Sequence, residues 1–162
     1  MFQANGQGDK AGVAIYISDK IDFKSKAIKR DTEGHFIILK GRIHQEYINI
    51  VNIYAPNTGA HRYIRKILED FKTDIDSNTL ILGDFNTSLS KIDRYSKRNT
   101  NKDIVALNNA LDQIDLTDTY RTFHLKEGTC TLLSNAHGTF SKIDHMIGHK
   151  TSLNKFKKIK II

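Results

Sequence analysis

The apolar residues of this chain are gathered into short segments that polar residues and turn signals separate. Residues 11–18, 35–43 and 46–53 are short and rich in β-branched side chains, which predicts strands. His44 and Gln45 join the last two segments, so we expect an antiparallel pair with a tight turn. A membrane-spanning helix needs about 18 consecutive apolar residues. Because no segment reaches that length, the pattern excludes a membrane span and favours a fold built around a sheet.

Two further segments have the period of a helix. Apolar residues recur at helical spacing along residues 61–75, and again after Thr100, where Thr100 and Asp103 resemble a capping box. Residues 79–83, 141–147 and 156–162 indicate additional strands. Strands and helices are mixed without regular βαβ alternation. We therefore predict a layered sandwich of the α/β (α+β) class, in one domain over residues 1–162.

The charge balance favours a polyanionic partner. The chain has 25 Lys and Arg against 18 Asp and Glu, a formal net charge of +7. A basic surface that only keeps the protein in solution explains the charge alone equally well. The single cysteine, Cys130, cannot form an internal disulfide, and residues 1–12 lack the apolar core of a signal peptide. We expect an intracellular monomer with no membrane partner.

One segment places a carboxylate and a carboxamide at the end of an apolar strand. In residues 80–87, Asp84 follows the apolar residues and Asn86 comes two positions later. In an extended chain both side chains point to the same side. A carboxylate there can orient water or hold a divalent cation, and an amide N–H can stabilise the charge of a phosphate. The alternative is an ordinary turn, in which Asp and Asn are common.

Two other strand ends carry polar groups. Asn52 and Tyr54 share a face by strand alternation, and a Tyr hydroxyl can donate to a phosphate oxygen; alternatively, Tyr54 only caps the core edge. Asp144 and His145 point to opposite faces, so a buried Asp144 needs another partner or a metal. Alternatively, Asp144 sits in solvent on an edge strand. The chain has no glycine-rich nucleotide loop, HExxH or CxxC motif, so we expect no small-molecule cofactor.

Together these segments resemble the endonuclease/exonuclease/phosphatase superfamily, and in particular the endonuclease domain of mammalian long interspersed element retrotransposons. The similarity is carried by Asn-Ile-Tyr-Ala-Pro-Asn at 52–57, Leu-Gly-Asp-Phe-Asn-Thr at 82–87 and Ser-Lys-Ile-Asp-His at 141–145. It extends to residues 11–15, 28–31 and 118–122. The resemblance implies a four-layered, DNase-I-like α/β sandwich that uses Mg²⁺ to nick DNA, in the nucleus.

The same resemblance implies roles for individual residues. Tyr54 is expected to contact the scissile phosphate, Asp84 to position the attacking water and bind the metal, and Asn86 to stabilise the transition state. Asp144 is expected to orient a catalytic His. Because the family places a hairpin near the DNA minor groove, the resemblance also implies a preference for A·T-rich steps. DNA contacts are implied for the hairpin around His137, Thr139 and Ser141. We also expect them for Asn57, and for Arg94 and Arg98 because these lie in a basic cluster that directly follows the Asp84 segment.

The sequence also departs from the family pattern. Family members begin with a strand ending in Asn and a strand whose Gln-Glu supplies the main metal-binding Glu; neither has a counterpart here, and no Ser-Asp-His occurs. We therefore expect a domain truncated at both ends, without its first strands and its last strand. Because losing one catalytic group costs several powers of ten in rate, we expect no measurable nicking by this chain. The alternatives are a non-catalytic DNA-binding remnant and a phosphoinositide phosphatase of the same superfamily.

Overall fold

A computed structural model of the protein describes residues 1–6, 11–90, 102–124, 132–134 and 139–155, with the backbone alone for 132–134 and 139–141. The elements, in chain order, are β1 (Phe2–Asn5), β2 (Gly12–Ile15), β3 (Phe23–Arg30), β4 (Phe36–Ile43), β5 (Glu46–Tyr54), α1 (Ala60–Asp70), β6 (Thr79–Asp84), α2 (Lys102–Gln113), β7 (Leu116–Asp118), α3 (Thr119–Phe123), β8 (Leu132–Ser134), β9 (Thr139–Ser141), β10 (Asp144–His149) and the 3₁₀ helix η1 (Lys150–Lys155). The class is mixed α/β, as the sequence predicts.

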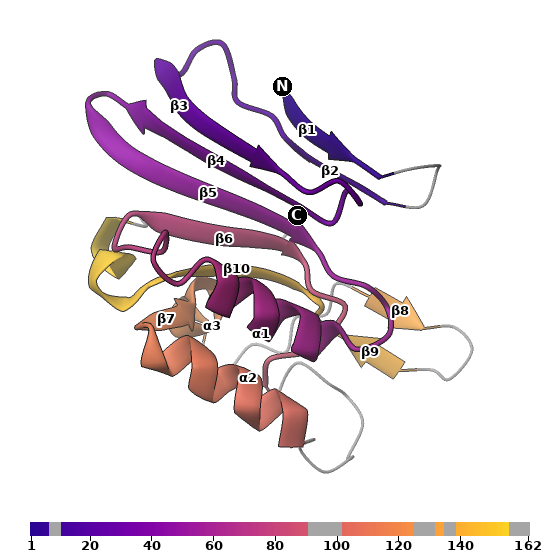
Figure 1. Ribbon diagram of the computed structural model, residues 1–162. Coiled ribbons are helices and arrows are strands. Elements are labelled where there is room, and N and C mark those ends of the chain that lie inside the picture. Colours follow the sequence, from indigo (N-terminus) through magenta and orange to yellow (C-terminus); the bar gives the residue numbers. More distant parts are fainter. Residues whose placement is uncertain (7–10, 91–101, 125–131, 135–138, 156–162) are drawn as a thin grey trace.

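Six strands of the described residues form the central sheet, in the order β3-β4-β5-β6-β10-β7 (Figure 1). Neighbouring strands are antiparallel except β5 and β6, which run parallel. A parallel pair needs a crossover connection, and α1 supplies it between β5 and β6. The carboxyl ends of β5 and β6 therefore meet at one end of the sheet, where β10 begins.

Helices α1 and α2 cover one face of the sheet (Figure 1). The apolar stripe predicted on the first helix is buried there: Ile64, Ile67 and Leu68 pack in one cluster with Val51, Ile53 and Ile81 of the sheet, and with Leu107 and Leu111 of α2. The helical spacing of these apolar residues thus gives α1 one apolar face, and burial of that face holds the helix layer against the sheet.

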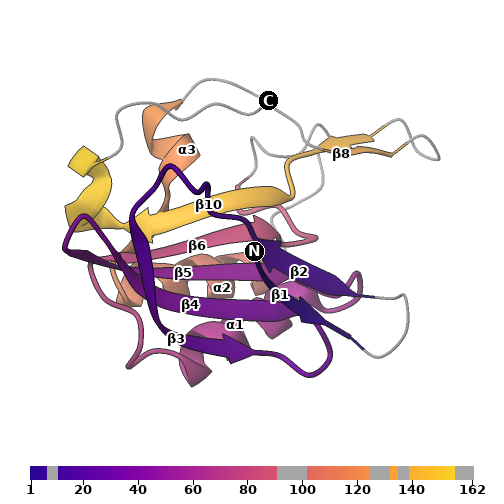
Figure 2. The ribbon, with the colours of Figure 1, turned by 90° about the horizontal axis from the view of Figure 1, so that it is seen from above.

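The β1–β2 hairpin lies on the other face, over β4 and β5 (Figure 2). Ala4, Val13 and Ile15 are buried against Ile37 and Leu39 of β4, and Ile50 and Tyr54 of β5 pack against this second cluster. Strand alternation explains the division, because alternate residues of β5 face the helices and the hairpin. The described residues thus form three layers: helices, the six-stranded sheet and the hairpin.

Most of the predicted elements are confirmed. The pair of strands around His44 and Gln45 has the predicted tight turn, with positive φ angles of 47° and 73° at these residues. The first helix ends at Asp70 rather than at residue 75, and the predicted strand 141–147 is divided between β9 and β10. The predicted strand 156–162 and Thr100 of the capping box lie outside the described residues.

The sequence pattern missed the outer strand β3. Its residues Lys24, Lys26 and Lys29 are exposed, and among the described strands it pairs only with β4. An edge strand with little burial has no continuous apolar segment, so hydrophobic patterning does not detect it. Within the described parts of the chain, no helix is both long and apolar enough to cross a membrane.

Gly83, next to Asp84, should be required for folding. Its φ is 131°, and a Cβ atom there would lie 2.0 Å from the carbonyl oxygen of Ile53. We expect Gly83→Ala to lower the free energy of unfolding by about 3 kcal/mol or more, through clash and backbone strain. Gly59→Ala is the matched control, because Gly59 also has a positive φ but a Cβ there meets nothing within 4 Å. The control should lose only about 1 kcal/mol in urea unfolding; equal losses would contradict the steric argument.

Candidate functional site

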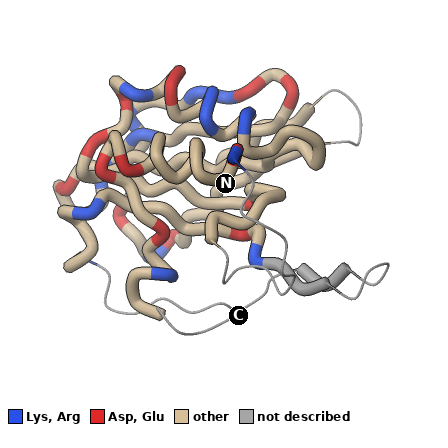
Figure 3. Tube along the Cα trace, turned by 90° about the horizontal axis from the view of Figure 1, so that it is seen from below, with Lys and Arg blue, Asp and Glu red and all other residues tan. Residues whose placement is uncertain are grey.

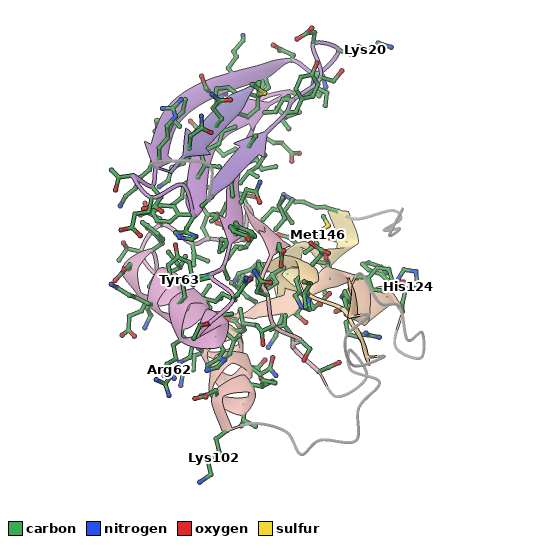
Figure 4. All side chains as sticks on the ribbon, turned by 90° about the vertical axis from the view of Figure 1, so that its right-hand side faces the viewer. Lys20, Arg62, Tyr63, Lys102, His124 and Met146 are labelled. Carbon is green, nitrogen blue, oxygen red and sulfur yellow. The ribbon has the colours of Figure 1, made fainter. Side chains whose placement is uncertain are left out.

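Three residues predicted from separate segments lie in a row at one end of the central sheet. Tyr54 on β5 is in register with Asp84 on β6, and Asp84 is in register with Asp144 on β10. Directly paired residues of neighbouring strands project from the same face. That face is the one away from the helices: Tyr54 packs toward the β1–β2 hairpin, and Met146, two residues after Asp144, lies on the side opposite α1 with its Tyr63 (Figure 4).

Asn86 joins Asp84 through a turn rather than through an extended strand. Strand β6 ends at Asp84, and Asn86 has a left-handed φ of 46°. The backbone N–H of Asn86 donates to Asp84 Oδ1 at 2.9 Å, and its Nδ2 donates to the carbonyl oxygen of Ala55 at 2.6 Å. The expectation that both side chains share one side of an extended chain is therefore wrong. The turn weighed as the alternative is present, and it holds the carboxylate and the amide together.

The pKa of Asp84 is raised above its ordinary value. Burial is the main cause, and the neighbouring Asp144 carboxylate adds to it, while the N–H of Asn86 and the charge of His145 act in the opposite direction. Repulsion between the carboxylates of Asp84 and Asp144 raises the free energy of the state in which both are ionised. A cation bound beside Asp84 would relieve that repulsion.

The donor set partly fits the Mg²⁺ that the family resemblance implies. Carboxylate oxygens are its preferred protein ligands, and it commonly takes one or two carboxylates together with waters and substrate phosphate. Asp84 and Asp144 meet that minimum. Among the described residues, however, no group of three or more His, Cys, Asp or Glu could hold a metal ion. A site here would depend on oxygens supplied by water and substrate.

Tyr54 is fixed by contacts with His35. The two rings stack with centroids 6.1 Å apart and planes 9° apart, and Nδ1 of His35 donates to the carbonyl oxygen of Tyr54 at 2.9 Å. Asn52 shares the face of Tyr54, as predicted, but its Nδ2 donates to the carbonyl oxygen of Ala14 at 2.9 Å. Asn52 therefore ties the hairpin to the sheet, and Tyr54 both packs against the core and lies in the row.

Asp144 is exposed, but the alternative of an edge strand is wrong. Strand β10 lies between β6 and β7. His145 points to the opposite face, as alternation predicts, and is buried there.

A buried charged cluster surrounds His145, and the sequence analysis missed it. Asp118 Oδ2 accepts hydrogen bonds from His145 Nδ1 and from Lys142 Nζ, each at 2.9 Å. Nε2 of His145 faces the carbonyl oxygen of Thr87 at 2.9 Å. Because both ring nitrogens face acceptors, the ring satisfies both only when it donates from each. Burial alone would raise the pKa of Asp118, but His145 and Lys142 outweigh burial and lower it to about 2.

The predicted DNA contacts are only partly described. Asn57 is exposed in the loop between β5 and α1. Thr139 and Ser141 belong to β9, which pairs with β8 in a ribbon just before β10. Arg94, Arg98 and His137 lie outside the described residues. Over the described trace, Lys and Arg are interspersed with Asp and Glu (Figure 3).

A cavity of about 380 Å³ lies at the opposite end of β5, β6 and β10. Its lining includes His44, Tyr47, Leu80, Gly148 and Lys155, and none of the predicted site residues that the structure describes. The cavity and the polar row are thus separate features.

Acid should destabilise the protein through Asp118. Its pKa is lowered from 3.8 to about 2 on folding, so its contribution is complete above about pH 4 and is lost as the pH falls through 2. The expected loss in the free energy of unfolding is about 2 kcal/mol. Urea unfolding followed by circular dichroism between pH 6 and pH 2 measures it. Asp118→Asn should be less stable at pH 7 and less dependent on pH in this window; an unchanged pH dependence would contradict the assignment.

Comparisons with known proteins concern the family and the fold of the chain. The profile of the Endonuclease/Exonuclease/phosphatase family matches residues 2–157. The endonuclease domain of TRAS1, a telomere-specific non-LTR retrotransposon, superposes with a TM-score of 0.67 at 16% identity, over 94% of this chain and 68% of that one. A 3′ phosphatase, NExo, from Neisseria bound to a product DNA hairpin gives 0.61 at 14% identity, over 82% and 61%. An AP endonuclease from Archaeoglobus fulgidus gives 0.61 at 15% identity, over 82% and 61%. This chain thus spans about two thirds of the length of these neighbours.

The structural neighbours, at such low identities, establish the fold, which is of the DNase-I-like type. Because the family profile covers nearly the whole sequence, the chain belongs to the endonuclease/exonuclease/phosphatase family.

Proposed function

We propose that this chain carries the phosphodiester-binding part of a DNA endonuclease domain from a retrotransposon protein. The observation that supports this most is the row of Tyr54, Asp84 and Asp144, with Asn86 held beside Asp84. It places a phenol, two carboxylates and an amide at one end of the sheet. The TRAS1 domain, a retrotransposon endonuclease, shares the fold. The nucleus is then the place of action.

Each residue of the row has a proposed task. The Tyr54 hydroxyl donates to an oxygen of the scissile phosphate. Asn86 uses one Nδ2 proton on the carbonyl oxygen of Ala55, so its second proton serves the charge that develops on the phosphate. Asp84 orients the attacking water and binds Mg²⁺, with Asp144 adding negative charge beside it. The role proposed for Asp144 from the family resemblance is to orient a catalytic His. Mg²⁺, when bound, would stabilise the charge of the phosphoryl group.

DNA is the proposed partner. A structural neighbour from Neisseria is described as bound to a product DNA hairpin, and the net charge of this chain is +7. Phosphate contacts by basic side chains give affinity that falls steeply with salt. The proposed contacts beyond the row are Asn57, Arg94, Arg98, His137, Thr139 and Ser141. We further propose that the isolated chain, a monomer, binds duplex DNA without cutting it.

Binding of a labelled duplex, measured by fluorescence anisotropy with and without Mg²⁺, tests the site. Tyr54→Phe removes one phosphate donor and should weaken binding by about fivefold, the equivalent of one hydrogen bond of about 1 kcal/mol. Asp84→Asn should bind more tightly than the wild type without Mg²⁺, because it removes negative charge beside the phosphate, and should lose any gain from Mg²⁺.

Asp70→Asn is the control, because Asp70 is an exposed carboxylate at the end of α1 and changes the net charge equally. It should leave affinity and the Mg²⁺ effect unchanged. Absence of binding at low salt would overturn the DNA proposal. Mg²⁺-dependent nicking of supercoiled plasmid by this chain, lost in Asp84→Asn, would overturn the proposal that it binds without cutting.

A further inference from the structure

We propose that His145 is a positioning residue: its ring fixes the backbone just after β6, and so holds Asn86 in the turn beside Asp84. The inference rests on the proposed function for its meaning, because it concerns the same site. The geometry that carries it lies on the helix-covered face, behind the row. No part of it requires His145 to touch a substrate.

Ile143 and His145, on either side of Asp144, contact the segment that follows Asp84. The backbone N–H of Phe85 donates to the carbonyl oxygen of Ile143 at 2.8 Å. His145 Nε2 lies 2.9 Å from the carbonyl oxygen of Thr87, and its ring lies 5.3 Å from the ring of Phe85. The residues on both sides of Asn86, Phe85 and Thr87, are therefore each held by a contact with Ile143 or His145.

The ring of His145 is itself held in a buried polar network. Asp118 Oδ2 accepts from its Nδ1, and Asp118 Oδ1 accepts from the backbone N–H of Arg121 at 3.0 Å. Lys142 is 1% exposed and lies 4.7 Å above the ring of Tyr120. Water does not reach such groups, so a broken hydrogen bond here is not replaced.

Asn86 needs external support because its backbone is left-handed, a conformation that costs most non-glycine residues about 1–2 kcal/mol. Its own hydrogen bonds reach Asp84 and Ala55, on the strand side of the turn. On the other side, the bond from His145 to Thr87 lies next to Asn86, and Asn108 Nδ2 donates to the carbonyl oxygen of Leu89, three residues after Asn86, at 2.7 Å. Without the bond from His145, the turn keeps only the more distant of these two supports.

Two substitutions separate the two hydrogen bonds of His145. His145→Asn keeps a donor at the position of Nδ1, which faces Asp118, and loses the reach to Thr87. His145→Gln keeps a donor near the position of Nε2, which faces Thr87, and loses the bond to Asp118. Both replacements are neutral amides, so they differ only in the position of the donor. A role confined to core stability predicts that they behave alike.

Amide hydrogen exchange measured by NMR distinguishes these cases without DNA. We expect the amide of Asn86 to exchange about tenfold faster in His145→Asn, relative to a reference amide in β4, and within about twofold of the wild type in His145→Gln. DNA affinity should follow the same order. Equal acceleration in both variants would overturn the positioning role. If the exchange pattern holds and neither variant nor wild type binds DNA, only the proposed function fails.

If both variants unfold, a measurement on the wild-type protein still tests the proposal. Proton-coupled nitrogen NMR of the His145 ring should find a proton on Nε2 at pH 7, protected from exchange with water. A bare Nε2 would mean that no bond to Thr87 exists, and would overturn the proposal.

Discussion

The candidate site depends on the parallel pairing of β5 with β6. Every other described pair in the central sheet is antiparallel. In an antiparallel pair the carboxyl end of one strand lies beside the amino end of the next, so the carboxyl ends of two neighbours do not meet. If β6 ran the other way, Asp84 would lie beside the beginning of β5 and far from Tyr54. The crossover helix α1 makes the parallel pair possible, and the burial of Ile64, Ile67 and Leu68 holds that helix in place. Ordinary hydrophobic packing on one face thus sets the chemistry at the end of the sheet.

Polar interactions rather than packing define the turn after β6. Asn86 is held by hydrogen bonds from both of its amide groups, and the carbonyl oxygen of Thr87 faces a buried histidine. Buried charges are costly unless each has its partner, so this region tolerates few alternative arrangements. The apolar core around α1, by contrast, can accept several side chains of similar volume. The conformation near the candidate site is therefore more narrowly defined than that of the apolar core.

Local patterns of the sequence predict what depends on local structure. The β4–β5 pair and the first helix follow from apolar periodicity within each segment, and Tyr54, Asp84 and Asp144 are recognisable as residues at strand ends. That these three lie side by side depends on strand order, which no single segment contains. The Asp118–His145 pair spans 27 positions of the chain, so alternation gives the face of His145 but not its partner. The family resemblance supplied the role of His137, and the clustering of basic residues those of Arg94 and Arg98. These three roles stay predictions because the residues lie outside the described part of the chain.

The two outer strands of the central sheet have a consequence for how the protein behaves in a crowded solution. An open strand edge is a template for pairing with other chains, and proteins suppress it with charge or with brevity. In the part of the sheet that the structure describes, β3 carries exposed Lys24, Lys26 and Lys29 along one edge, and β7, with three residues, forms the other. Like-charged edges repel one another, and a three-residue edge offers few hydrogen bonds to a second copy. Lateral growth of sheets between molecules is therefore disfavoured at both ends, so the lysines of β3 protect colloidal stability whether or not they also meet a polyanion.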